Sequence, residues 1–167
     1  MKKYELTEET VTVYGKTLYR IRAVRDFGSV KTGEFGGYIE KEENLSHFDN
    51  AWVFDNARVY DNARVYDNAW VCGDAKVYGD AWVSGNAEVF NTRHFFVQGP
   101  IGSRNGFITF YRTKDNTVEV RCGCFSGSLQ KFVDRVEETH GGSRYEKEYK
   151  LAAELAKVCI RLEGESR

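Results

Sequence analysis

A six-residue repeat runs from Ala51 to Phe90 and constrains the fold more than any other feature of the sequence. Seven consecutive units read AWVFDN, ARVYDN, ARVYDN, AWVCGD, AKVYGD, AWVSGN and AEVF, with alanine first and valine third in every unit. A short period kept without a slip indicates a repeat architecture rather than an accident of composition.

The spacing within each unit predicts a coil. Alanine and valine lie two residues apart, so in an extended segment both side chains point the same way. The Asp-Asn, Gly-Asp or Gly-Asn pair that follows tolerates left-handed backbone angles and turns the chain. We therefore expect a short strand and a turn in each unit. Three units should close one coil of eighteen residues, stacked at about 4.8 Å on the next.

This segment resembles the hexapeptide-repeat proteins, whose fold is a left-handed parallel β-helix. That family usually has a small residue beside the aliphatic one, whereas this chain has Phe, Tyr, Cys or Ser beside the valine. The resemblance implies a left-handed coil and association of the chains as trimers.

An eighteen-residue coil stacks outward-facing aromatic side chains above one another. Trp52 should lie under Trp70, Tyr60 under Tyr78, Phe48 under Tyr66, and Phe54 under Cys72 and Phe90. Three interpretations stay open: the ladders stabilise the coil, one face packs against another subunit, or a ligand stacks on the rings. The residues predicted at an oligomer interface are Trp52, Phe54, Trp70, Tyr60, Tyr78 and Trp82.

The segments on either side of the repeat predict two further parts. Residues 4–27 alternate as a β-hairpin around Gly15, which would cover the open end of the coil. The coil should begin near Ile39, with less regular first turns. We predict a mainly β fold with a hairpin cap at 1–35, a left-handed parallel β-helix at 36–91 and an α+β domain at 92–167.

The C-terminal domain is expected to hold a hairpin and two helices. The predicted strands are 94–97, 107–112 and 118–125, with a loop from Gly99 to Gly106, and the core face would carry Ile108, Phe110, Val120 and Cys122. Ser128 can cap a helix that ends at Gly141, and Ser143 with Glu146 forms a capping box for a second helix.

Two strings extend the resemblance to bacteriophage proteins. IRAVRDFG, followed by GGYIE and NLS, looks like the opening of hexapeptide-repeat proteins of phages and prophages. GPIGSRNGFITFYRTKD and VRCGCFSGSLQKFVDRVEETHG look like a module that recurs in phage proteins. The resemblance implies a setting in the host cell but assigns no chemistry.

Charge and cysteine usage predict a soluble cytoplasmic protein. The net charge is −1, which attracts neither a nucleic acid polymer nor a membrane surface, and MKKYELTEE has no apolar run behind its lysines. The four cysteines lack the spacing of small secreted domains, and Cys122-Gly-Cys124 lacks the partners of a metal site. We expect no metal and no cofactor.

Catalysis is not expected, although the resemblance keeps an enzymatic alternative. Hexapeptide acyltransferases use a histidine at a subunit interface. Here His47 is expected at an inward position, His94 lies beyond the coil, and His140 ends a helix. No catalytic residue is therefore predicted, and acyltransferase remains the alternative.

The glycine-rich segment from Gly99 to Gly106 is the candidate ligand site. Backbone N–H groups of such a segment can converge on an anion, and arginine adds a bidentate phosphate partner. A turn-rich connection with solvated arginines is the competing interpretation. The predicted ligand-binding residues are Gly99, Gly102, Ser103, Arg104, Asn105, Thr109, Tyr111, Arg112 and Arg121.

These features favour a non-enzymatic, homo-oligomeric binding protein. The ligand would be a nucleotide or cyclic nucleotide that serves as a host immune signal, and the partner could instead be a host defence protein. The hairpin and two helices are similar in layout to small phage proteins that take up cyclic nucleotide signals. A structural or protein-interaction scaffold is a further alternative.

Overall fold

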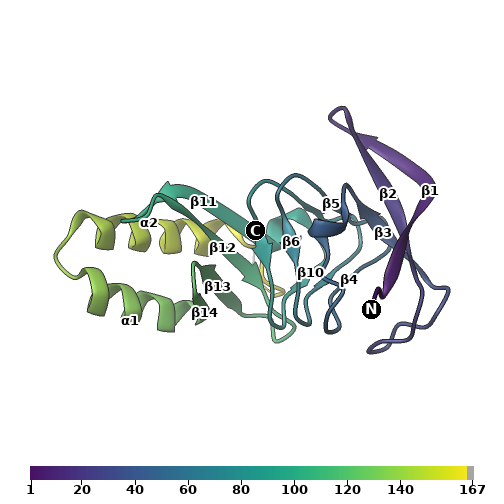
Figure 1. Ribbon diagram of the computed structural model, residues 1–167. Helices are drawn as coiled ribbons and strands as arrows, with labels where there is room; N and C mark the ends of the chain where they lie inside the picture. The colour runs from purple at the N-terminus through teal and green to yellow at the C-terminus, as the bar shows by residue number, and fades with distance from the viewer. Residues whose placement is uncertain (165–167) are drawn as a thin grey trace. The chain divides into compact units, whose positions relative to one another are not determined.

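A computed structural model describes residues 1–164, and the chain divides into two compact units, Met1–Thr92 and the part from Arg93 onward. Strands dominate the described residues, and both α-helices belong to the second unit (Figure 1). The mainly β fold agrees with the prediction. No helix of the described residues is long and apolar enough to cross a membrane.

The repeat forms a β-solenoid of short parallel strands. Strands eighteen residues apart pair in register, so that Trp52 lies beside Trp70 and Val53 beside Val71. The same spacing recurs on the other two faces, as in Arg58 with Lys76. The strands are β4 (Trp52–Val53), β5 (Arg58–Val59), β6 (Arg64–Val65), β7 (Trp70–Val71), β8 (Lys76–Val77), β9 (Trp82–Val83) and β10 (Glu88–Val89).

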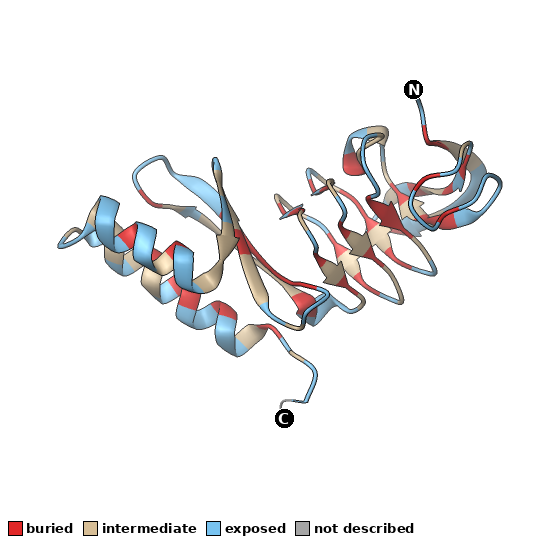
Figure 2. Cartoon of the chain, turned by 90° about the horizontal axis from the view of Figure 1, so that it is seen from below, coloured by how far each residue is buried: buried red, intermediate tan, exposed pale blue. Residues whose placement is uncertain are grey.

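The alanine and valine of every unit fill the interior of the solenoid. All seven alanines and all seven valines of the repeat are at most 2% exposed, and Figure 2 shows buried residues recurring along the coils. Backbone N–H groups of one coil donate to carbonyls of the next, as from Trp52 to Ala69 at 3.0 Å and from Phe54 to Val71 at 3.0 Å. The prediction of inward alanine and valine is confirmed.

The turns explain the Asp-Asn and Gly-Asp pairs. Asp55, Asp61 and Asp67 have φ of 54°, 59° and 56°, a conformation that aspartate tolerates better than most residues. Each carboxylate accepts a hydrogen bond from the backbone of the glycine one coil above, such as Asp61 from Gly79 at 3.1 Å. Side-chain amides add a second ladder, such as Asn62 donating to Asp80 at 3.1 Å.

The N-terminal segment extends one face of the solenoid. Strands β1 (Tyr4–Val13) and β2 (Lys16–Ala23) form the hairpin, and β3 (Phe35–Ile39) follows. The sheet order is β1-β2-β3-β5-β8, and β3 pairs in parallel with β5. The hairpin is therefore continuous with the coil.

Two buried side chains of this segment cover carbonyl groups of the first coil. The Lys3 ammonium donates to the carbonyls of Ala51, Phe48 and Asp49 at 2.7, 3.1 and 3.4 Å. The Tyr4 hydroxyl donates to the carbonyl of Leu45 at 2.7 Å. Carbonyls with no coil beyond them thus receive donors from the cap, as buried polar groups require.

The first coil departs from the predicted register. After a 3₁₀ turn, η1 (Glu42–Asn44), Leu45 pairs with Val65, twenty residues away. The first coil therefore contains two residues more than the eighteen of a regular coil. The prediction that His47 points inward is wrong, because Leu45 takes that place. The prediction that Phe48 lies under Tyr66 is also wrong, because the shifted register puts Ser46 in that place, where its backbone N–H donates to the Val65 carbonyl at 2.9 Å, and leaves Phe48 75% exposed.

The second unit is a four-stranded antiparallel sheet with two helices. After a 3₁₀ turn, η2 (Thr92–His94), the order is β11 (Phe95–Ile101), β12 (Gly106–Arg112), β13 (Val118–Cys122) and β14 (Phe125–Ser128). Helices α1 (Leu129–His140) and α2 (Arg144–Cys159) are capped by Ser128 and Ser143. The core joins Ile108, Phe110 and Val120 to residues of both helices.

Two predicted boundaries in this unit are wrong. The segment 99–106 is not an open loop, since β11 runs to Ile101 and only 102–105 form a turn. The segment 118–125 is not one strand, because Gly123, at φ 57°, and Cys124 make a tight turn between β13 and β14. Glycine at the first position of a two-residue loop is typical of a type II′ hairpin.

Candidate functional site

The structure divides the predicted ligand residues into separate groups. Ser103, Arg104 and Asn105 lie in the turn between β11 and β12 and are exposed. Gly99 lies within β11, and Arg112 ends β12 at the far end from the turn. A strand of seven residues is about 20 Å long, so Arg104 and Arg112 cannot bind one phosphate.

The turn donates its first N–H groups to helix α2. The backbone N–H of Gly102 donates to Oε2 of Glu148 at 2.7 Å, and the backbone of Ser103 bonds to the Tyr149 hydroxyl. A Cβ at Gly102 would lie 1.8 Å from the Tyr149 hydroxyl oxygen, so only glycine fits there. A carboxylate of the chain itself therefore accepts the hydrogen bond of the Gly102 N–H group, at the turn where the sequence predicts an anion to bind.

Arg144 lies near this carboxylate, and Arg104 lies near the neighbouring Tyr149 hydroxyl. Nε of Arg144, in the first turn of α2, is 3.7 Å from Oε1 of Glu148. Burial raises the pKa of the Tyr149 hydroxyl, and the positive charge of Arg104 opposes that rise, which places Arg104 near the same end of the unit. Within residues 1–164 the Arg104 side chain makes no ion pair. Ser103, Arg104, Asn105 and Arg144 are therefore the accessible part of the candidate site.

The other predicted ligand residues do not belong to this site. Thr109, Tyr111 and Arg112 are buried, at 2%, 0% and 3% exposure. Arg112 donates to the Asn116 side chain at 3.2 Å and lies 3.4 Å from a Glu163 carboxylate oxygen, which ties the β12–β13 turn to the C-terminal segment. Arg121 pairs with Thr109 in mid-sheet. Placing these four residues around the turn was wrong, because they lie along the sheet rather than at its end.

Two of the six predicted interface aromatics are buried within the chain. Trp52 is 3% exposed and packs edge-on against Phe27, with ring centroids 5.2 Å apart. Tyr60 is 3% exposed and packs with Val13 and Leu18 of the hairpin. The prediction of an interface at Trp52 and Tyr60 is wrong, because the N-terminal segment covers both rings.

The remaining four aromatics keep the interface prediction open. Phe54 and Trp70 are half-buried and meet edge-on at 5.4 Å. Tyr78 and Trp82 are 43% and 38% exposed, and the Arg64 guanidinium lies 5.6 Å from the Trp82 ring. Exposed aromatic rings on the coil are compatible with an interface or with a ligand.

His47 belongs to the first unit and His94 precedes β11 at the end away from the turn, whereas His140 packs on Tyr149, whose hydroxyl meets the turn, with ring centroids 5.4 Å apart. His47 stacks on Tyr4 at 4.2 Å, and burial lowers its pKa although Glu42 opposes this. Burial, with the Arg112 charge, lowers the pKa of His94 to about 4, so this residue is neutral near pH 7. Burial raises the pKa of the Cys122 thiol. Among residues 1–164 no three metal-binding side chains come together.

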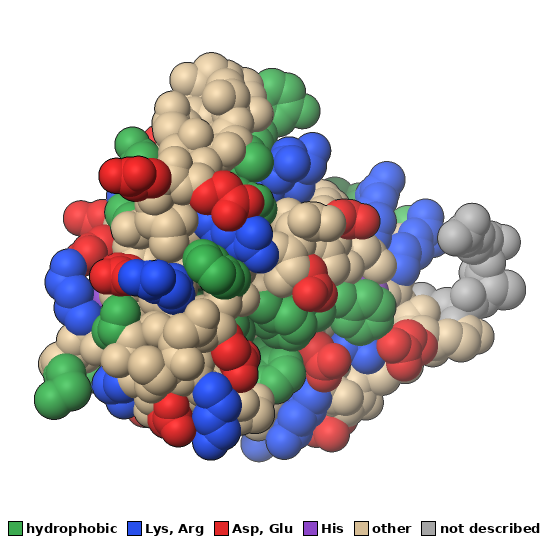
Figure 3. Space-filling view, turned by 90° about the vertical axis from the view of Figure 1, so that its right-hand side faces the viewer, with side chains coloured by type: hydrophobic (Ala, Val, Ile, Leu, Met, Phe, Trp, Pro, Cys, Tyr) green, Lys and Arg blue, Asp and Glu red, His purple; other side chains and the backbone are tan. Residues whose placement is uncertain are grey.

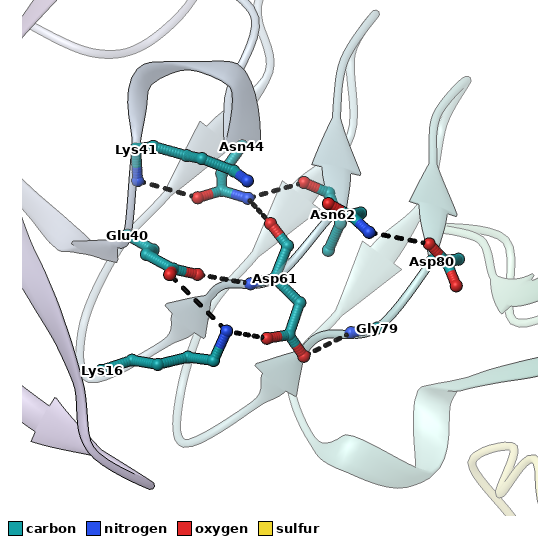
Figure 4. A network of polar contacts seen from close by, with 9 residues as sticks. Lys16, Glu40, Lys41, Asn44, Asp61, Asn62, Gly79 and Asp80 are labelled. Carbon is teal, nitrogen blue, oxygen red and sulfur yellow. Dashed lines mark hydrogen bonds and ion pairs between the residues drawn. The ribbon is translucent and has the colours of Figure 1, made fainter.

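A polar network lies at one corner of the solenoid (Figure 4). The Lys16 ammonium is 2.5 Å from Oδ1 of Asp61 and 3.6 Å from Oε1 of Glu40. Glu40 also accepts from the backbone N–H of Asp61 at 2.7 Å. The side chains of Asn62 and Asp80 continue the network along the coils.

On the face shown in Figure 3, basic and acidic side chains are interspersed, with hydrophobic ones between them.

The roles of Glu148 and Lys3 were not predicted from the sequence. Glu148 accepts a hydrogen bond from the turn, and Lys3 donates to carbonyls at the end of the coil. Glu148 is 46 positions from Gly102, and Lys3 is 48 positions from Ala51. An acidic residue in a helix and a lysine near a chain end are ordinary in composition. Only the tertiary fold reveals their roles.

Comparison with known proteins supports the repeat architecture. Residues 57–73 match the family model described as the YdcK beta solenoid repeat, which covers about one coil of this chain. No curated protein shows significant similarity to the sequence. The match agrees with a repeat β-solenoid and covers no part of the second unit.

Proposed function

We propose that the protein is a non-enzymatic, oligomeric binding protein of phage type that captures a phosphate-bearing nucleotide in the cytoplasm of a bacterial host. The observation that carries the proposal is the exposed Arg104 on a turn whose N–H group already binds the Glu148 carboxylate at 2.7 Å. A cyclic nucleotide used as an immune signal fits the ligand class, and its capture would act against host defence.

The chemistry of the turn favours an anion. A backbone N–H and two guanidinium groups can donate hydrogen bonds but cannot accept them. Arginine binds phosphate through two parallel hydrogen bonds. Glu148 shows that an oxyanion is accepted at Gly102. A ligand phosphate would compete with this carboxylate for the N–H group and gain Arg104 and Arg144.

The proposed assembly is a left-handed β-helix that associates as a trimer or a multiple of it. The resemblance to hexapeptide-repeat proteins supports the handedness and the trimer, and the exposed Trp82 with the half-buried Phe54 and Trp70 supplies apolar area for contacts. Several identical copies of the second unit would then act together, which gives a sponge rather than a single-site receptor.

The oligomer is tested with a variant that spares the hairpin. Trp70→Ala combined with Trp82→Ala removes two outward rings of the coil, and we expect a lower mass in light scattering. Phe48→Ala, which removes a 75% exposed ring outside the six predicted positions, should leave the mass unchanged. An unchanged mass in the double variant would refute the interface.

The nucleotide site is tested by native mass spectrometry with a panel of nucleotides and cyclic dinucleotides. Loss of one charged hydrogen-bonding partner costs about 1.5–3 kcal/mol, so Arg104→Ala should weaken binding by roughly 10- to 100-fold. Arg135→Ala removes an exposed arginine of α1 and should have no effect. Equal binding by the two variants would show that the turn is only a connector.

A protein-interaction scaffold is the second candidate function. Leu151, Leu155 and Val158 lie on one side of α2 and are 70%, 46% and 68% exposed. Three aliphatic side chains at helical spacing form an apolar stripe that usually contacts another protein. A host defence protein would be such a partner, and replacing the three residues with glutamine or serine would abolish its capture while leaving nucleotide binding intact.

A further inference from the structure

A second surface with binding chemistry lies where the tip of the hairpin meets the solenoid. We call it the Tyr14 corner, and it consists of Tyr14, Lys16, Asp61, Asn62, Tyr78 and Asp80. It belongs to the first unit and is separate from the turn that holds Arg104.

Tyr14 occupies the hairpin tip against backbone preference. Its φ is 47° and that of Gly15 is 77°, the pattern of a two-residue turn in which asparagine or glycine usually stands first. A left-handed conformation costs a bulky residue about 1–2 kcal/mol. The ring is 86% exposed, so packing within the chain does not compensate for that cost.

A second tyrosine presents an ordered ring near the first. Tyr78 is 43% exposed and stacks on Tyr60, with ring centroids 5.3 Å apart and planes inclined by 10°. Burial raises the pKa of the Tyr60 hydroxyl, and Tyr78, Tyr14 and Asp61 raise it further, which agrees with their lying around it. The stack holds Tyr78 in a fixed orientation.

Polar groups beside the rings are held in place by the network of Figure 4. Lys16 follows the tip directly and joins Asp61, whose second oxygen accepts from the Gly79 backbone at 3.1 Å. One coil above Asn62, Asp80 accepts its amide at 3.1 Å. Asn62 keeps a second amide hydrogen and its carbonyl oxygen for a ligand, and Asp80 keeps further lone pairs.

We propose that the Tyr14 corner binds a neutral saccharide. Sugars combine apolar C–H faces, which pack on the electron-rich faces of aromatic rings, with hydroxyl groups that both donate and accept hydrogen bonds. The corner offers two exposed rings beside carboxylate, amide and ammonium groups. The carboxylates of Glu40, Asp61 and Asp80 balance the nearby charges of Lys16, Lys41 and Arg58, so the corner offers no net positive charge to a phosphate-bearing ligand.

The inference does not depend on nucleotide binding by the second unit. An apolar protein partner fits the corner poorly, because the carboxylates beside the rings would have to lose their water. A saccharide replaces that water with its own hydroxyl groups.

The experiment is saturation-transfer difference NMR of the full chain with neutral oligosaccharides built from glucose, galactose, mannose or N-acetylglucosamine. The informative variant is Tyr14→Asn, because asparagine suits the left-handed turn and should keep or raise the melting temperature. We expect saturable binding of at least one oligosaccharide, weakened at least tenfold by Tyr14→Asn. Phe48→Ala removes another strongly exposed ring of the same unit, 75% against 86% for Tyr14, and should leave the affinity unchanged.

The remaining outcomes overturn the proposal. If no oligosaccharide of the panel binds, or if Tyr14→Asn binds as well as the unmodified chain, the corner is not a saccharide site. If Phe48→Ala weakens binding as much as Tyr14→Asn does, the sugar does not bind specifically at the Tyr14 corner. Arg104→Ala, which tests the nucleotide site, should leave sugar binding intact, so the two proposals succeed or fail separately.

Discussion

The buried ammonium of Lys3 makes the stability of the solenoid depend on pH in an unusual range. Burial, with repulsion from Arg25, lowers the pKa of Lys3 to about 8 from 10.5, although Asp49 opposes the change. The side chain is fully buried and donates to three carbonyls of the first coil. Replacement by methionine keeps the length and apolar stem of the side chain and removes its charge.

The sign and size of the pH dependence of stability follow from proton linkage. Between pH 8 and 10.5 the unfolded chain binds a proton at Lys3 that the folded chain has lost, so the free energy of unfolding rises with pH. The penalty of burying the charge is fully present below pH 8 and disappears by pH 10.5. The difference between these two pKa values corresponds to about 3 kcal/mol, since each factor of ten is worth about 1.4 kcal/mol.

The assay is urea unfolding of the unmodified chain and Lys3→Met at several pH values from 7 to 9.5. Tryptophan fluorescence reports the first unit alone, because the three tryptophans of the chain are all in the repeat. At pH 7 we expect Lys3→Met to be less stable by about 1–3 kcal/mol, because buried carbonyls lose their donor. By pH 9.5 this gap should widen by about 2 kcal/mol.

Lys2→Met is the matched control, because Lys2 is largely exposed and its ion pair with Glu42 lies on the surface. A surface pair is worth about 0–1 kcal/mol, so Lys2→Met should differ from the unmodified chain by no more than that. If the unfolding free energies of the unmodified chain and Lys3→Met run parallel over this pH range, the explanation from burial of Lys3 is refuted.

Two further predictions concern the second unit, whose helices make far-UV circular dichroism its natural probe. The folded chain holds His94 neutral down to about pH 4 while the unfolded chain protonates near 6.5, so stability should fall as pH drops through that window, by up to about 3 kcal/mol. Urea unfolding at pH 4.5 and 7 should show this loss in the unmodified chain and not in His94→Gln; an equal loss in both would exclude His94 as the cause. Gly102→Ala should destabilise by about 1–3 kcal/mol more than Gly142→Ala, because both glycines have φ near 80° but only a Cβ at Gly102 meets the Tyr149 hydroxyl. Equal melting temperatures of these two alanine variants would contradict the packing described for the turn.

The regular part of the fold could be predicted because it depends on local period alone. Alanine and valine at fixed positions and a turn after each valine determine which side chains point inward, and no distant contact changes this. The same reasoning failed for His47 and Phe48, because two extra residues break the period next to the N-terminal cap. It also failed for Trp52 and Tyr60, whose burial depends on a hairpin that pairs through tertiary contacts.

The candidate site was harder to predict because strand and loop signals conflicted. Gly99 and Pro100 suggested a loop, yet β11 is at the edge of its sheet, where proline removes no necessary hydrogen bond. The segment therefore continues as a strand and leaves a turn of four residues. Gly102 and Arg104 are predicted ligand residues, but nothing in the sequence indicates that Glu148 of a distant helix accepts the Gly102 N–H.

Because repeating hydrogen bonds link the corners of successive coils, the length of the solenoid can change in fixed steps. Corner aspartates and asparagines bond to the corner eighteen residues later, and each inner valine pairs with a valine of the next coil. A duplicated stretch of eighteen residues would therefore bring every partner it needs and leave both ends of the coil as they are. Such a duplication would lengthen the solenoid by about 4.8 Å, the distance between neighbouring strands. Evolution or an engineer could thus change the reach of this protein one coil at a time, without redesigning either end.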